Sequence, residues 1–145
     1  MKVRRLKRDE INKSLDLVWN VFCEFEATNY PEHGKALFWQ AIHSEDYLNI
    51  LTAYGAFDDS NRLVGIIATR NEGTHIALFF VDGDYHGQGI GKKLWNVMLN
   101  DNENDKITVH SSQYAAPIYD KLGFVKTGDM QTEDGMTFIP MVFER

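Results

Sequence analysis

The chain carries the stretch His86-Gly87-Gln88-Gly89-Ile90-Gly91-Lys92-Lys93, which follows an apolar run at residues 76–81. Its three glycines at alternate positions leave a backbone without Cβ atoms, so the amide N–H groups can close around an anion. The helix expected to begin here adds the positive end of its dipole. Two lysines in the first helical turn would be repelled by the positive end of that dipole unless bound phosphate groups offset the charge. The stretch therefore predicts a pyrophosphate-binding turn between a strand and a helix.

Two familiar glycine motifs do not fit this spacing. A dinucleotide fingerprint, G-x-G-x-x-G, would need its third glycine where Lys92 stands. A Walker loop would need glycine at the position of His86 and Ser or Thr at that of Lys93. A flexible strand-to-helix turn with incidental glycines therefore stays open as the alternative for this stretch taken alone.

A second pattern follows the expected strand Lys106–His110 and begins at Ser111. Together the two segments resemble the GCN5-related N-acetyltransferase superfamily, from about Leu63 to the C-terminus. The first signature of that family, Gln/Arg-x-x-Gly-x-Gly/Ala, falls on residues 86–91, with His86 in place of Gln or Arg. The second, roughly Ala-x-x-x-Tyr-x-x-x-Gly-Phe, falls on Ala115, Tyr119, Gly123 and Phe124.

The resemblance implies a single N-acetyltransferase domain over residues 1–145. Its expected fold is α/β (α+β), with a mixed, mostly antiparallel central sheet of about six to seven strands, flanked by helices, and a splayed strand pair. Acetyl-CoA is the implied acyl donor, and the backbone of residues 79–81 would lie beside its pantetheine like an added strand. Ser112 stands where the family frequently has Asn. The coenzyme-binding positions expected from the resemblance are Phe79, Phe80, Val81, His86, Gly87, Gln88, Gly89, Ile90, Gly91, Lys92, Ser112 and Tyr119.

Two residues are candidates for catalysis. The resemblance places Tyr119 near the coenzyme sulfur, where a hydrogen bond from its hydroxyl would help the thiolate to leave; a packed tyrosine is the alternative. His75 opens the strand before the glycine turn, and a near-neutral pKa would suit it to accept an ammonium proton. It resembles a histidine at the corresponding strand position of arylalkylamine acetyltransferases. A solvated or hydrogen-bonded histidine is the alternative there.

Three further residues are candidates for binding the acyl acceptor. Glu24 and Glu26 lie late in the first expected helix, and Tyr30 lies in the loop that follows. In the resembled family this helix and loop usually border the acceptor site. The acidic side chains could bind an amine, deprotonate it, or only face water.

Composition limits the other possibilities. A chain of 145 residues with 43% apolar residues fits one domain with a real core, and its net charge of −6 argues against a general nucleic-acid partner. A single cysteine, Cys23, excludes an intramolecular disulfide and is expected to be a buried structural thiol. The five histidines show no metal-ligand spacing, so no metal is expected. No apolar run is long enough for a membrane span, and no secretory signal is apparent, so the cytoplasm is the expected location.

Hydrophobic spacing predicts the order of the elements. A first strand is followed by a helix capped by Asp9, then by two shorter helical regions, three antiparallel strands and the main helix. The expected ranges are Val3–Lys7, a helix to about Phe25, Glu32–His43, Glu45–Leu51, Tyr54–Phe57, Leu63–Arg70, Thr74–Val81, Gly89–Asn100, Lys106–His110, Ala115–Leu122, and a hairpin of Phe124–Gly128 and Met136–Glu144 with a turn at Glu133–Gly135.

The sequence therefore predicts an acetyl-CoA-dependent N-acetyltransferase that acts on a primary amine of a small molecule or peptide. The amine would attack directly within a ternary complex. A non-catalytic acyl-CoA-binding sensor module is the alternative, and a longer acyl donor also stays open. A homodimer formed through the C-terminal strands is compatible with the resemblance.

Overall fold

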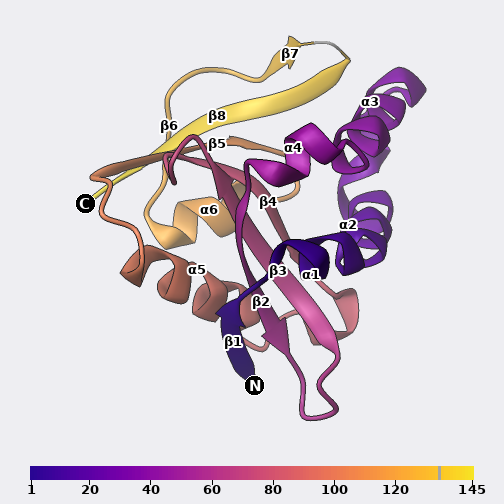
Figure 1. Cartoon of the computed structure of the whole chain (residues 1–145). Coiled ribbons are helices and arrows are strands. Elements are labelled where there is room, and N and C mark those ends of the chain that lie inside the picture. Colours follow the sequence, from indigo (N-terminus) through magenta and orange to yellow (C-terminus); the bar gives the residue numbers. More distant parts are fainter. Residues whose placement is uncertain (134) are drawn as a thin grey trace.

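A computed structural model describes residues 1–133 and 135–145, and eight strands among them form the central sheet. The strands lie in the order β1-β2-β3-β4-β5-β8-β6, and β7 pairs with β8 (Figure 1). Their bounds are β1 (Lys2–Arg5), β2 (Thr52–Phe57), β3 (Leu63–Arg70), β4 (His75–Val81), β5 (Lys106–Ser111), β6 (Val125–Lys126), β7 (Gln131–Glu133) and β8 (Met136–Glu144). The pair β4–β5 is parallel, and the other described pairs are antiparallel. The expected mixed, mostly antiparallel sheet is confirmed, with eight strands instead of six to seven.

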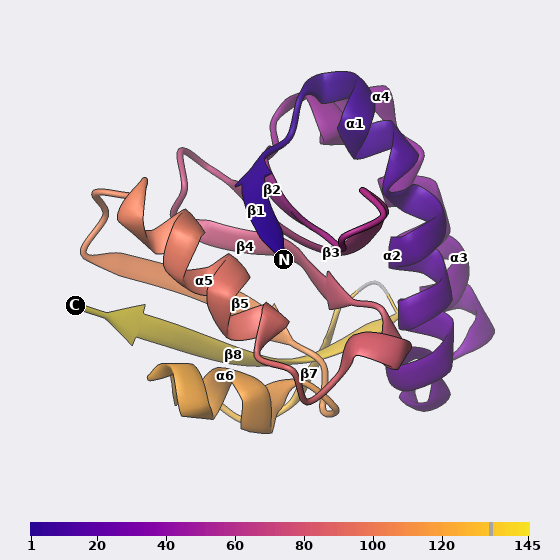
Figure 2. The same cartoon turned by 90° about the horizontal axis from the view of Figure 1, so that it is seen from below.

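Helices cover both faces of this sheet, as Figure 1 and Figure 2 show. They are α1 (Arg8–Lys13), α2 (Leu15–Val21), the π-helical turn η1 (Phe22–Glu26), the 3₁₀ turns η2 (Ala27–Asn29) and η3 (Gly83–Tyr85), α3 (Glu32–Ile42), α4 (Glu45–Asn49), α5 (Ile90–Asn100) and α6 (Ala116–Leu122). One hydrophobic cluster joins the sheet to α1–α4 and includes Phe22 and Phe80. The other joins it to α5 and α6 through Leu94, Trp95 and Tyr119. Among the described residues, no helix has the length and apolar character needed to cross a membrane.

The first helix departs from the expected pattern in three places. Its N-cap is Lys7, not Asp9, and it breaks at the buried Ser14, whose hydroxyl donates to the carbonyl of Ile11 at 2.6 Å. It then widens into the π-helical turn η1, in which side chains no longer follow the 3.6-residue period of an α-helix. Cys23 is exposed, and the prediction of a buried structural thiol was wrong.

The pair β4–β5 is splayed, as the resemblance implied. The two strands pair at two positions, His75 with Thr108 and Ile76 with Val109, and then separate. A register shift against β3 leaves Ala77 as the bulged residue, because Thr69 lies opposite Ile76 and Ala68 lies opposite Leu78. A bulge bends its strand and increases the local twist. The carboxyl half of β4 therefore leaves β5 and opens a gap in the sheet.

The C-terminal strands differ from a simple hairpin. The long strand β8 lies between β5 and β6, and the expected strand Phe124–Gly128 shrinks to two residues. Gln131–Glu133 forms the additional strand β7, with Gln131 opposite Phe138. The turn expected at Glu133–Gly135 includes Asp134, which lies outside the described residues. The tip formed by β7 and β8 overhangs the side of the sheet on which α3 lies (Figure 1).

Candidate functional site

The glycine turn forms an open cradle at the start of α5. Gly87 and Gly89 both have φ of +78°, a conformation that L side chains rarely adopt, and Gly89 is the N-cap of the helix. A Cβ added at either glycine would meet no atom within 4 Å, so the space in front of the backbone is free among the described residues. Ile90 is buried and anchors the helix to the core. This arrangement fits a diphosphate bound by backbone N–H groups.

The polar side chains of the cradle have different roles. His86 Nε2 donates to the carbonyl of Val81 at 2.7 Å, and its ring packs on Phe25, so it fastens the turn to the end of β4. Gln88 reaches the carbonyl of Asp84 at 3.5 Å. Lys93 Nζ donates to the carbonyl of Met1 at 2.7 Å and is directed away from the turn. Lys92 is exposed and is the lysine of this pair left for a bound anion.

The backbone of β4 presents polar groups to the gap. The N–H of Asp82 donates to the carbonyl of Val64 at 2.8 Å, and Phe80 lies opposite Ile66. In an antiparallel ladder, alternate residues bond to the partner strand and the residues between them face away. The peptide groups of Phe80 therefore face β3, whereas those of Phe79 and Val81 face the gap. The carbonyl of Val81 is already occupied by His86, as described above.

A cavity of about 510 Å³ lies where the gap meets η1 and α3. It is lined by these expected site residues: Glu26, Tyr30, His75, Phe79, Phe80, Ser112 and Tyr119. Glu24 is not among its lining residues; it is exposed and lies beside Gly83 on the cradle side of η1. The fold thus brings the predicted catalytic residues and one of the two predicted acidic residues to one cavity.

Glu26 is a cavity residue with a strongly raised pKa. Burial raises its pKa from 4.5 to about 7, although a hydrogen bond from the Ser112 hydroxyl partly offsets the rise. The π-helical turn places Glu26 at its last position, next to the cavity. Burial, together with the nearby charge of Glu26, raises the pKa of Tyr30 to about 12. A carboxyl group that titrates near neutral pH is suited to accept a proton.

Replacing Glu26 by glutamine should stabilise the fold at high pH. Below about pH 4 the carboxyl group is protonated in both folded and unfolded chains, so it contributes nothing to the pH dependence. Above its folded pKa of about 7 it is ionised in both states, and the native state bears the full cost of burying the charge. The variant should exceed the parent chain by about 3 kcal/mol in unfolding free energy at pH 8 and match it at pH 4. Urea denaturation at both pH values measures this; equal gains at both would contradict the buried ionised carboxylate.

Tyr119 lies on α6 with its ring enclosed by aromatic neighbours. The ring meets Phe79 at 5.9 Å and Phe124 at 5.2 Å between centroids, and the residue is buried. Burial, together with the charge of Glu26, raises the pKa of Tyr119 well above its ordinary value. The hydroxyl therefore stays protonated and is available as a hydrogen-bond donor at neutral pH. Ser112 supports the helix start, since its Oγ accepts the N–H of Ala115 at 3.1 Å.

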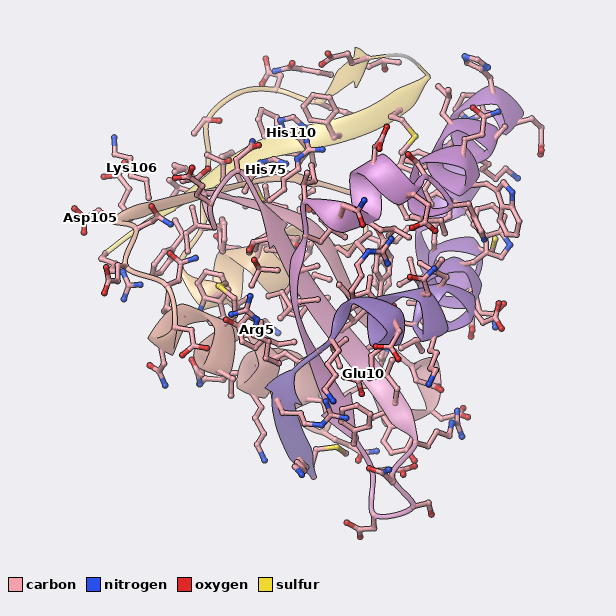
Figure 3. The ribbon with its side chains drawn as sticks, viewed as in Figure 1. Arg5, Glu10, His75, Asp105, Lys106 and His110 are labelled. Carbon is pink, nitrogen blue, oxygen red and sulfur yellow. The ribbon has the colours of Figure 1, made fainter. Side chains whose placement is uncertain are left out.

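His75 is less basic than expected. It is buried at the closed end of the gap, where Nδ1 lies 2.8 Å from the Thr108 hydroxyl and the ring meets His110 edge to face (Figure 3). Burial, followed by the charges of Arg70 and His110, lowers its pKa to about 4. The near-neutral pKa expected for His75 was therefore wrong, because the sequence shows neither that the imidazole is buried nor that Arg70 lies beside it.

Two further residues of the cavity could not be recognised as site residues from the sequence. Arg70 ends β3 and His110 lies near the end of β5, and both line the cavity. Charged or polar residues are common at strand ends, so these two stand out only because the fold brings both to the same cavity. Among the described residues, no group of three His, Cys, Asp or Glu side chains could hold a metal ion.

Comparison with known proteins agrees with this geometry. The model of the acetyltransferase (GNAT) domain family matches residues 25–145, and the chain belongs to that family. No curated protein matches the chain.

Solved structures share the fold. A GCN5-related N-acetyltransferase from Rhodopseudomonas palustris superposes with a TM-score of 0.82 at 18% identity, covering 99% of this chain and 95% of that one. PaiA N-acetyltransferase from Thermoplasma acidophilum, solved in complex with coenzyme A, has a TM-score of 0.72 at 20% identity, covering 99% and 98%. A GNAT-family acetyltransferase from Staphylococcus aureus has a TM-score of 0.70 at 19% identity, covering 99% and 98%. At these identities the likeness establishes the fold.

Proposed function

We propose that this protein is an acetyl-CoA-dependent N-acetyltransferase that acetylates a primary amine of a small molecule or peptide. The observation that carries the proposal is the course of β4, which runs from a cavity holding Glu26 and Tyr119 to an open glycine cradle. Membership of the acetyltransferase family supports it, as does the coenzyme A bound to the Thermoplasma relative. The whole chain would act as one catalytic domain.

The chain has groups suited to each part of the coenzyme. The backbone N–H groups of residues 87–91 and the ammonium of Lys92 would hold the diphosphate. The N–H and carbonyl of Phe79 and the N–H of Val81, which face the gap, would pair with the pantetheine arm as an added strand does. The coenzyme itself supplies an acetyl group activated as a thioester. Because Cys23 is exposed and is not a lining residue of the cavity, we expect no covalent acyl-enzyme.

Glu26 is the proposed general base, in place of His75. In the transfer the amine nitrogen forms the new C–N bond, the C–S bond breaks, and the proton released from nitrogen passes to Glu26. A carboxylate with a pKa of about 7 can accept that proton at neutral pH, whereas a histidine with a pKa of about 4 is a much weaker base. Tyr30 stands beside Glu26 at the wall of the cavity and would help to orient the amine.

Tyr119 is the proposed hydrogen-bond donor to the departing sulfur. Its raised pKa disfavours transfer of a whole proton, so the hydroxyl would act by a hydrogen bond that strengthens as negative charge develops. Two observations support this role: the ring packs on Phe79, in the part of β4 that has separated from β5, and the charge of Glu26 acts on the hydroxyl.

Two measurements test the proposal together. Calorimetric titration with acetyl-CoA should give saturable binding, and a thiol-release assay over a panel of primary amines should give turnover with at least one. Absence of binding at hundreds of micromolar acetyl-CoA contradicts the proposal. Binding without transfer to any amine in a broad panel would instead assign the chain to a non-catalytic acyl-CoA-binding module.

Replacing Gly89 by alanine should weaken coenzyme binding by about tenfold. The left-handed φ of +78° at this position strains an alanine by about 1 kcal/mol, and the added Cβ occupies the space in front of the amide groups. Calorimetry with coenzyme A measures the change. Gly73→Ala is the control for backbone strain, because Gly73 has φ of +87° in the turn between β3 and β4; its Cβ would also meet Asn102 Nδ2 at 2.7 Å. Equal affinity losses in the two variants would show that strain alone, and not the cradle, causes the effect.

A further inference from the structure

Arg70 is a cation that lines the cavity, and none of the residues that the structure describes forms an ion pair with it. Its Nε is buried and makes no hydrogen bond to any described residue. Buried polar atoms are nearly always hydrogen-bonded, so a buried Nε without a partner, on an arginine that lines a cavity, requires an explanation. An anion bound in the cavity would supply an acceptor for the guanidinium group of Arg70.

The groups around Arg70 leave its charge uncompensated. His75 lies directly opposite it across the β3–β4 ladder, and the ring of His110 lies 4.8 Å from that of His75. Figure 3 shows these two imidazoles side by side where β4 and β5 meet. The pKa of each histidine is lowered, first by burial and next by Arg70, so neither imidazole carries charge at neutral pH.

Two more titratable groups complete these surroundings. Tyr47, whose pKa burial raises, faces the same guanidinium and is neutral at pH 7. Glu133 on β7 lines the cavity, and its charge partly offsets the lowering of the His110 pKa. It is exposed, however, and forms no ion pair with Arg70 within 4 Å. Among the described groups around Arg70, no carboxylate therefore forms an ion pair with the guanidinium.

Arg70 also lies at a useful place relative to the transfer chemistry. It pairs with His75 at the start of β4, whereas Tyr119 packs on Phe79, four residues further along the strand. Four residues of strand span about 13 Å, and a long arginine side chain can bridge part of that length. An acceptor could therefore place its amine near Glu26 and Tyr119 and its opposite end at Arg70.

We infer that the acceptor is an amine that also carries a carboxylate, held by the guanidinium of Arg70 beside His75 and His110. The planar guanidinium matches a carboxylate in two parallel hydrogen bonds, and its single charge balances a single negative charge. A polyamine would instead bring a second cation next to Arg70. This inference rests on the proposed function, because it names the substrate class of the same cavity.

Acetylation kinetics test the inference with matched acceptors. Glycine, β-alanine, γ-aminobutyrate and δ-aminovalerate are each compared with the corresponding amide in a thiol-release assay. At least one acid should exceed its amide in kcat/KM by about 30-fold or more, and Arg70→Gln should remove that preference by lowering activity on the acid alone. Arg8→Gln, which removes a half-buried arginine on α1 that does not line the cavity, is the matched control and should keep the preference. Equal rates on acids and amides would overturn the inference.

A second readout does not depend on turnover or on a variant. In the parent chain saturated with coenzyme A, NMR follows the imidazole signals of His75 and His110 during titration with the same acids and amides. A carboxylate bound at Arg70 offsets the positive charge that lowers both histidine pKa values, so the acids should raise them and the amides should not. No response to any acid would overturn the inference, as would a stronger response to aminoethylphosphonate than to β-alanine.

The two proposals fail in different ways. If no amine is acetylated but the acids still shift the two histidines, the transfer function is wrong and the carboxylate site remains. If amines are acetylated without regard to a carboxylate and the histidines do not respond, the function stands and the acceptor class is wrong.

Discussion

Replacing Glu26 by glutamine is expected to lower kcat/KM by about 100- to 10,000-fold, the usual contribution of a positioned general base. Glutamine keeps the size of the side chain and can still accept the hydrogen bond from Ser112, but it cannot accept a proton. The substitution also stabilises the fold at high pH, so lost activity could not be attributed to unfolding. Steady-state thiol release with saturating acetyl-CoA measures the effect.

The pH profile gives this prediction its sharpest form. Only the carboxylate form of Glu26 can act as a base, so kcat/KM of the parent chain should rise with pH and level off above the pKa of about 7. The rise near pH 7 should be absent from the residual activity of Glu26→Gln. It should persist in His75→Gln, because the pKa of His75 is about 4. A profile whose rise disappears with His75 would assign the base to that residue.

Glu24→Gln is the matched control for this substitution. Glu24 lies on the same turn, two residues before Glu26, but it is exposed and does not line the cavity. Its replacement should leave kcat/KM within about twofold, as is usual for surface positions. A loss as large as that of Glu26→Gln would mean that the negative charge of the turn, and not a particular carboxylate, supports the reaction.

Replacing Tyr119 by phenylalanine is expected to lower kcat by about 10- to 100-fold, the value of one hydrogen bond to a charged group. The hydroxyl would act when negative charge develops on sulfur, so the ground-state complex gains little from it. The dissociation constant of coenzyme A should therefore change by less than about twofold. Single-turnover kinetics and calorimetry separate these two quantities.

Tyr54→Phe distinguishes a chemical role from a packing role. Tyr54 is also buried, but its hydroxyl donates to Asp101 at 3.0 Å and it is not a lining residue of the cavity. This control should lose stability and retain kcat. If Tyr119→Phe weakened coenzyme binding as much as it lowered kcat, Tyr119 would be a binding or packing residue.

Much of the architecture could be predicted because it depends on local preferences. Glycines at 87 and 89 adopt the left-handed conformation that side chains resist, and the apolar spacing after them produces α5. The two signatures also indicated the family, which then implied the splayed strands. The local sequence pattern did not predict features that depend on tertiary contacts. The first helix widens at η1 and leaves Cys23 exposed, and β8 lies between β5 and β6.

The acid–base properties of the site follow from neighbours that are distant in sequence. Glu26 replaces His75 as the proposed general base because burial favours the neutral form of each side chain. Burial therefore raises the pKa of the carboxyl group and lowers that of the imidazole. Arg70 deepens the effect at His75 and has an orphaned nitrogen only because β3, β4 and β5 bring it to the cavity. A residue's backbone preference is a property of its own side chain and so can be inferred from sequence. Its charge state depends on how much water and which charges surround it, and folding determines both.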